Sequence, residues 1–256
     1  MPRLLWKTTL AAVLIGLTSY AFGTVDPEQT QQDIKSMTVP ELERAGDASR
    51  AMKDYPQAVQ YLLEALRKDK KNASLYNKLG LAQLARDENG LARAAFEKAI
   101  KLNSKYADAL NNLGAVYFKE NRMGGAVKNF KKAVALDETR ATFRVNLGAA
   151  WFNQKKVEAS MKEYARALEL DPEVLARTSR AGITAQISSP EERAKFYFAL
   201  AKIHAKRGDV EDCLRCLKIA KDNGSRELAN VYRDEQFKRL WDDSRLHEVV
   251  PPPAAK

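Results

Sequence analysis

The sequence has few residues that break helices and few that build metal or disulfide sites. Its 256 residues include 12 Gly and 9 Pro, roughly 8% together where about 12% is average. This shortage disfavours an all-β sandwich with many turns and favours long helices. Two Cys and two His leave little material for a disulfide framework or a multi-ligand metal site. The composition therefore predicts a folded helical protein with little catalytic equipment.

Common catalytic motifs are also missing. The sequence contains no GxxxxGK[ST], HExxH, GxSxG or GxGxxG pattern, and scattered carboxylates or serines on solvated helix faces indicate no particular chemistry. We therefore expect no catalytic residues, no cofactor, no bound metal and no enzymatic activity. The net charge of +10 is dispersed along the chain, so nucleic-acid binding is not expected. An acidic partner or an anionic lipid surface stays open.

The N-terminus predicts export from the cytoplasm. Residues 1–7 carry two positive charges, and the uncharged run 8–25 ends before Asp26. A positive flank, a short apolar core and then small residues are typical of a bacterial-type signal peptide, here with cleavage after Gly23. An uncleaved anchor formed by residues 1–23 stays open, because 18 uncharged residues just reach the length of a spanning helix.

Both readings place the rest of the chain outside the cytoplasm, in the periplasm or secreted. Residues 24–38 are polar, with little apolar spacing, and predict a flexible linker. Residues 251–256 predict a disordered tail.

A period of about 34 residues organises the middle of the chain. The pairs Leu79-Gly80, Leu113-Gly114 and Leu147-Gly148 recur at that interval, and Ala45-Gly46 precedes them. A small residue, then an aromatic residue or Leu, then an alanine follow each pair: Ala58, Leu62 and Ala65; Ala92, Phe96 and Ala99; Ala126, Phe130 and Ala133; Ser160, Tyr164 and Ala167. Four contiguous blocks result, at 39–72, 73–106, 107–140 and 141–174.

Each block has the pattern of two antiparallel helices. In the third block, apolar residues at helical spacing predict a first helix over 108–120 and a second over 125–136. Gly114 and Ala126 are small where the two backbones approach, and Phe130 fills the wedge towards the next block. One hairpin of this size cannot bury its apolar stripe, so neighbouring hairpins must stack.

This pattern resembles the tetratricopeptide repeat (TPR). The Leu-Gly, Ala, aromatic and Ala slots carry the resemblance over about 136 residues, and Asp171-Pro172 matches the Pro that closes many units. The first-helix Trp of the family is absent from all four blocks. The resemblance implies an all-α solenoid, a right-handed superhelix of helical hairpins whose first helices line a concave surface that binds peptides or partner helices.

A weaker fifth unit follows an interruption. Residues 194–227 repeat the slots with Cys213, Leu217 and Ala220, after a connector at 175–193. Residues 228–250 are expected to cap the solenoid, with a helix over 234–249 that breaks near Asp242.

The resemblance also predicts which side chains line the concave groove. They are Asn77, Leu81, Leu84, Asn111, Asn112, Ala115, Phe118, Val145, Asn146, Ala149 and Phe152. A row of Asn can pair with a peptide backbone whatever its sequence, and Phe118 and Phe152 are candidate apolar anchors. Alternatively, the Asn side chains bond between units and stiffen the solenoid. The Lys and Arg clamp of some family members is not expected, because its slots hold Asn, Val and Ala here.

Cys213 and Cys216 form a CxxC pair with three open readings: buried core residues, a disulfide, or a redox pair. The leading functional hypothesis is a non-catalytic scaffold that binds a protein or peptide segment in its concave groove. One alternative is a membrane-tethered envelope assembly factor anchored by residues 1–23, the only case in which membrane contact is expected. The other is a thiol–disulfide protein. The sequence does not determine the oligomeric state.

Overall fold

The computed structural model describes residues 27–179 and 189–253. Within these ranges the chain is a series of helices without a β-strand, which confirms the all-α prediction. The segment predicted to direct export, residues 1–23, lies outside the described residues.

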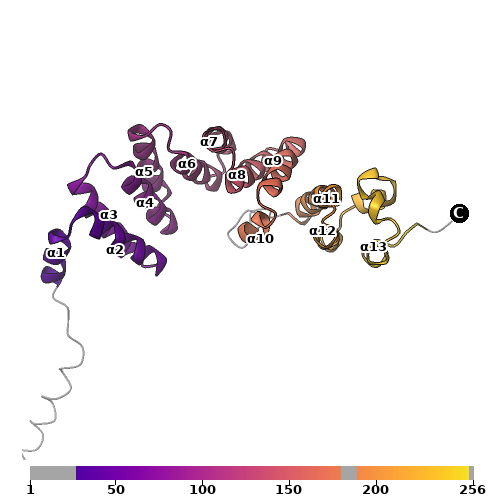
Figure 1. The fold of residues 1–256 in the computed structure, drawn as a ribbon, viewed down its shortest axis with the longest axis horizontal. Coiled ribbons are helices and arrows are strands. Elements are labelled where there is room, and N and C mark those ends of the chain that lie inside the picture. Colours follow the sequence, from indigo (N-terminus) through magenta and orange to yellow (C-terminus); the bar gives the residue numbers. More distant parts are fainter. Residues whose placement is uncertain (1–26, 180–188, 254–256) are drawn as a thin grey trace, which may run out of the picture.

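Four helical hairpins form the body of the molecule. They are α2 (Val39–Ala51) with α3 (Tyr55–Lys68), α4 (Ala73–Ala85) with α5 (Asn89–Leu102), α6 (Ala107–Lys119) with α7 (Met123–Leu136), and α8 (Ala141–Asn153) with α9 (Val157–Leu170). The second helix of each hairpin packs against the first helix of the next. The stack forms an arc, with first helices along its inner side and second helices along its outer side (Figure 1).

The turn inside each hairpin has the same geometry every time. Its left-handed residue is Lys53, Asp87, Asn121 and Lys155 in turn, with φ values of 63°, 65°, 57° and 61°. These positions recur at the repeat interval, and one left-handed residue closes each first helix. The turn is therefore shorter than expected in the third hairpin, where α7 already begins at Met123 rather than at residue 125.

The turns that follow the hairpins also have a repeated geometry. In each, the side chain of an Asp or Asn accepts a hydrogen bond from the backbone N–H two residues later. Asp69, Asn103, Asp137 and Asp171 each accept a hydrogen bond from that N–H through Oδ1, at 3.1, 3.1, 3.2 and 3.1 Å. Such Asx turns hold the chain in one local conformation. Because the same turn recurs at the same interval, the first four hairpins join one another in the same way, and the turn at Asp171 leads into the helix that follows the fourth.

Close contact between a glycine and an aromatic ring joins the two helices of a hairpin. Gly80 faces the buried ring of Phe96, and Gly114 faces that of Phe130. In the fourth hairpin the pair is Gly148 and Tyr164. A side chain at the glycine would occupy the space of the ring, so the small residue determines how closely the helices approach.

The N-terminal end corrects one expectation. Residues 24–38, predicted to be a flexible linker, contain the helix α1 (Pro27–Ser36). Its Ile34 is buried against the first hairpin. Lys68 of α3 donates hydrogen bonds to the carbonyl oxygens of Lys35 and Met37, which stabilises the C-terminal end of α1. A single buried apolar residue was too weak a periodic signal to predict this helix.

After the fourth hairpin the regular spacing ends. The short helix α10 (Val174–Ser179) packs against α8 and α9. A fifth hairpin follows, made of α11 (Pro190–Arg207) and α12 (Val210–Asp222), and its turn uses Gly208 at φ 83°. As expected, Cys213, Leu217 and Ala220 are buried in its core.

The C-terminal cap differs from the single broken helix that was expected over 234–249. It consists of the 3₁₀-helices η2 (Glu227–Arg233) and η3 (Glu235–Leu240) and the short helix α13 (Ser244–Val249). Asp243 caps α13, which agrees with the predicted break near Asp242. Buried Phe237 and Leu246 close the core of the last hairpin.

We predict that Gly114→Ala destabilises the protein by about 1–3 kcal/mol, the usual cost of overpacking a core. The added Cβ would lie 2.6 Å from two carbons of the Phe130 ring. Urea unfolding monitored by circular dichroism measures the change. Gly90→Ala is the control, because its Cβ meets nothing within 4 Å in α5 and should increase stability by up to about 1 kcal/mol. Similar effects of both substitutions would contradict this role of Gly114.

Candidate functional site

The inner surface of the arc carries the predicted groove residues on α4, α6 and α8. Four of them, all asparagines, form a chain of hydrogen bonds across three hairpins. Asn146 donates from Nδ2 to Oδ1 of Asn111 at 2.8 Å, and Asn112 donates to Oδ1 of Asn77 at 2.9 Å. The two halves meet within α6, where Asn111 donates to Asn112 at 3.5 Å.

This chain confirms the interpretation in which the asparagines bond between units. Every bond donates in the same direction, from the fourth unit towards the second. A carboxamide carries two donor hydrogens and two acceptor lone pairs, so one bond in each direction leaves further capacity on each side chain. Asn111, Asn112 and Asn146 are half-buried and accessible from the inner surface. Their contact with a peptide stays a prediction.

A small apolar surface lies among the helices that bear this chain. Leu81 and Leu84 of α4 and Ala115 of α6 are half-buried and pack at the edges of the core clusters. Their exposed portions are apolar and small. They suit short side chains rather than a large aromatic anchor.

The remaining predicted groove residues are covered. Phe118 and Phe152 are only 8% and 7% exposed, so the expectation that they present anchors to a partner is wrong for this conformation. The ring of Phe152 packs edge-on against Phe196 of α11 at 5.2 Å between centroids. Val145 and Ala149 are also buried. The chain that follows the fourth hairpin therefore covers the α8 end of the predicted surface.

An ion-pair cluster at the other end was not predicted from sequence. Lys78 of α4 contacts Glu43 at 2.7 Å and also Asp47, both on α2. Partial burial lowers the pKa of Lys78, but its bonds to Asp47 and Glu43 outweigh this and raise the pKa overall. The lysine is therefore charged and already paired. The signal in the sequence was a basic residue that follows two acidic residues at close to one repeat interval.

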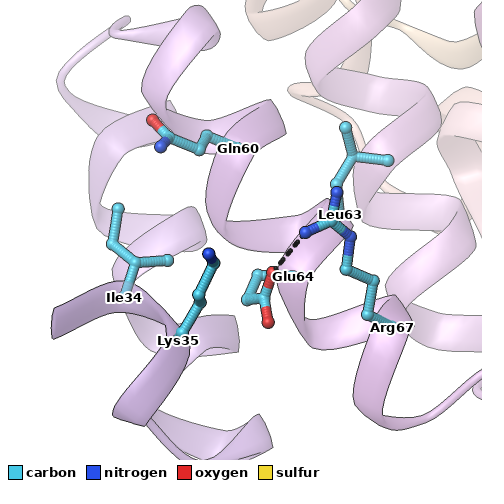
Figure 2. A pocket seen from close by; sticks show the side chains of 6 residues that line it. All are labelled: Ile34, Lys35, Gln60, Leu63, Glu64 and Arg67. Atoms are coloured by element: carbon cyan, nitrogen blue, oxygen red, sulfur yellow. Dashed lines mark hydrogen bonds and ion pairs between the residues drawn. The ribbon is translucent and has the colours of Figure 1, made fainter. Parts of the chain in front are cut away.

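A pocket of about 130 Å³ lies between α1 and α3 (Figure 2), and none of the asparagines of the chain lines it. It is lined by Ile34, Lys35, Gln60, Leu63, Glu64 and Arg67. Arg67 pairs with Glu64 at 3.0 Å. The pocket is smaller than typical small-molecule sites.

The CxxC pair lies in an apolar environment. Cys213 and Cys216 are free thiols buried in α12. Desolvation by burial raises the pKa of each thiol to about 12. Redox cysteines have the opposite property, a lowered pKa at an accessible position. The geometry therefore favours the core reading over the disulfide and redox readings.

Two other classes of site have no candidate in the described ranges. Over residues 27–179 and 189–253, no three His, Cys, Asp or Glu side chains gather as metal ligands would. None of the helices described has the length and hydropathy needed to cross a bilayer.

This architecture is that of a helical-repeat solenoid with a lined inner surface. Family models described as TPR repeat match residues 46–87 and 84–121, and others described as tetratricopeptide repeat match 107–140 and 124–174. Together the matches span half of the chain. The chain belongs to the tetratricopeptide repeat family.

Solved structures agree on the fold. MamA has a TM-score of 0.52 at 17% identity, over 75% of this chain and 94% of its own. YrrB, described as a TPR protein with an unusual peptide-binding site, has a TM-score of 0.51 at 18% identity, and the match covers 80% of this chain and 96% of YrrB. PilF of Pseudomonas aeruginosa has a TM-score of 0.54 at 17% identity, and the match covers 86% of this chain and 90% of PilF. No curated protein sequence matches the chain.

TPR proteins bind proteins or peptides and are in general non-catalytic scaffolds. Family and fold together therefore support a protein-interaction scaffold.

We predict that Asn112→Ala lowers the free energy of unfolding by about 1–3 kcal/mol, the cost of leaving a buried polar group unpaired. The substitution removes the donor to Oδ1 of Asn77, a residue that is only 6% exposed. Thermal and urea unfolding of the full chain measure the effect. Asn230→Ala, at an exposed position in η2, is the matched control and should change stability by under about 0.5 kcal/mol. Equal, small changes would show that the chain of amides contributes no stability.

Proposed function

We propose that the inner surface of α4 and α6 binds an extended protein segment, without catalysis, and that it does so outside the cytoplasm. The observation that supports this most directly is the asparagine chain, which places amide groups in a row across three hairpins. A row of amides follows the direction in which an extended chain would run along the groove.

The chemistry suits recognition of a backbone rather than of charged side chains. Asn111 and Asn112 retain donor and acceptor capacity after their mutual bonds, and a peptide group offers one donor and one acceptor per residue. The partially exposed Leu81 and Ala115 would lie beside small apolar side chains of the bound segment. Lys78 is held by two carboxylates, so it is not available to clamp a terminal carboxylate.

The proposed surface is shorter than the one predicted from sequence. Burial of Val145, Ala149 and Phe152 removes most of the α8 positions from contact. Asn146 remains as the last accessible amide at that end. The proposed site is therefore centred on the second and third hairpins. The peptide-binding site named for YrrB is consistent with this proposal at the level of the shared fold.

The proposed location rests on the sequence of residues 1–23. A cleaved signal would leave the solenoid in the periplasm or secreted, and an uncleaved one would tether it to the membrane as an envelope assembly factor. The thiol–disulfide alternative is not favoured, because both thiols are buried with raised pKa values.

The binding surface is tested with a photo-crosslinking amino acid. Placed at Leu81 or Ala115 in the full chain, it should cross-link a partner in cells of the source organism, because both positions face the proposed segment. The control position is Ala94, exposed on α5, and should give no cross-link to the same partner. Mass spectrometry identifies the adducts. Cross-linking from Ala94 but not from Leu81 or Ala115 would place the partner elsewhere on the solenoid.

The location is tested by sequencing the N-terminus of the native protein purified from its source cells. We predict a chain that begins at Thr24, because Ala21 and Gly23 provide the small residues that a signal peptidase requires. A chain that begins at Met1 and fractionates with membranes would support the tethered alternative instead.

A further inference from the structure

The helix α7 carries a run of lysines without acidic residues. Lys128, Lys131 and Lys132 are all exposed, and no Asp or Glu lies between Met123 and Leu136. The acidic residue that follows, Asp137, already pairs with Arg140 at 3.3 Å. Among the described residues, none of the three lysines forms an ion pair. The charge of these three lysines is therefore not neutralised by any ion pair within residues 27–179 and 189–253.

The repeat extends this charge to the neighbouring outer helices. Lys98, Lys132 and Arg166 recur at the repeat interval, in one equivalent slot of α5, α7 and α9. Lys128 and Lys162 share a second slot in the same way. Equivalent slots of stacked units align along a solenoid. The result is a band of cations along the outer side of the arc, where Figure 1 places α5, α7 and α9.

Acidic residues on α5 and α9 limit where the band is positive, whereas α7 has none. Glu163 contacts Arg144 of α8 at 3.0 Å, and both side chains are largely buried. Glu169 pairs with Arg166 at 2.7 Å and so neutralises the band cation of α9 in that slot. Glu97 and Glu158 are exposed acids towards the two ends of the band. The band is therefore most positive at its centre, on α7.

The chemistry of the band favours a diffuse anionic surface over a shaped partner. Its cations are lysines, apart from Arg166, and lysine acts as a flexible point charge rather than as a planar fork that fixes a carboxylate. Leu91 and Leu136, on α5 and α7, are 56% and 42% exposed. Exposed leucines beside lysines are typical of surfaces that lie on a bilayer, where the leucines enter the headgroup region.

We propose that the outer face of the solenoid, centred on Lys128, Lys131 and Lys132 of α7, associates with an anionic lipid surface. This contact is independent of residues 1–23 and of the proposed peptide groove, which lies on the opposite side of the arc. It would orient the groove away from the bilayer. An acidic protein is the competing partner, but it would favour arginine forks, and the one arginine of the band, Arg166, is already paired with Glu169.

The test is binding of the full chain to vesicles of phosphatidylcholine alone or with about one-third phosphatidylglycerol, by flotation at about 50 mM and 500 mM salt. We expect binding to require the anionic lipid and to be lost at high salt. The variant K128Q/K131Q/K132Q should raise the lipid concentration for half-binding by on the order of 100-fold, since each lysine near such a surface contributes about fivefold. Glutamine keeps the helix intact, which circular dichroism verifies.

The matched control is K206Q/K218Q/K238Q, which removes the same charge from exposed positions on α11, α12 and η3. It should change the lipid concentration for half-binding by no more than about twofold, because charges farther than a Debye length from the lipid surface are screened. Equal losses of vesicle binding in both variants would show that only the net charge of the protein matters, which would overturn the proposal. So would binding that ignores phosphatidylglycerol. If the α7 variant lost binding to poly-glutamate but kept vesicle binding, an acidic polypeptide would replace the lipid.

Discussion

The close approach of two helices at a glycine is the contact on which the rest of the structure depends. In each of the first four hairpins a ring or leucine from the second helix occupies the space that a side chain on the first would take, as Phe96 does opposite Gly80 and Phe130 opposite Gly114. This contact determines the separation of the helices. Because the turns within the hairpins and the turns that follow them also recur at the same interval, one geometry is repeated along the arc.

The chemistry of both faces follows from that repetition. Side chains in equivalent slots line up across units, so a single residue type repeated at the interval becomes a continuous feature. On the inner side, asparagines aligned in this way bond from one unit to the next. On the outer side, aligned lysines repel one another and stay exposed. Two surfaces of different character therefore arise from one repeated hairpin.

The proposed activity concerns binding alone, and the structure narrows where it occurs. The short helix α10 and the fifth hairpin interrupt the regular stacking after α9. Phe196 of that hairpin contacts both Phe152 and Tyr164, with centroid distances of 5.2 and 5.4 Å. The aromatic side chain that appeared suited to holding a partner instead joins the irregular end to the regular units.

The sequence by itself determined the interval, the hairpins and the slots, because these depend on local spacing and on the small residues needed at close contacts. It also indicated that the asparagines of successive units lie side by side. Only the tertiary structure decided which slots stay open: Phe118 is buried in the core shared by the third and fourth hairpins, and Phe152 is covered by Phe196 of the irregular fifth hairpin. The sequence also could not predict α1 or the 3₁₀-helices of the C-terminal cap. These elements have few apolar residues, which become buried only against the hairpins that they cover.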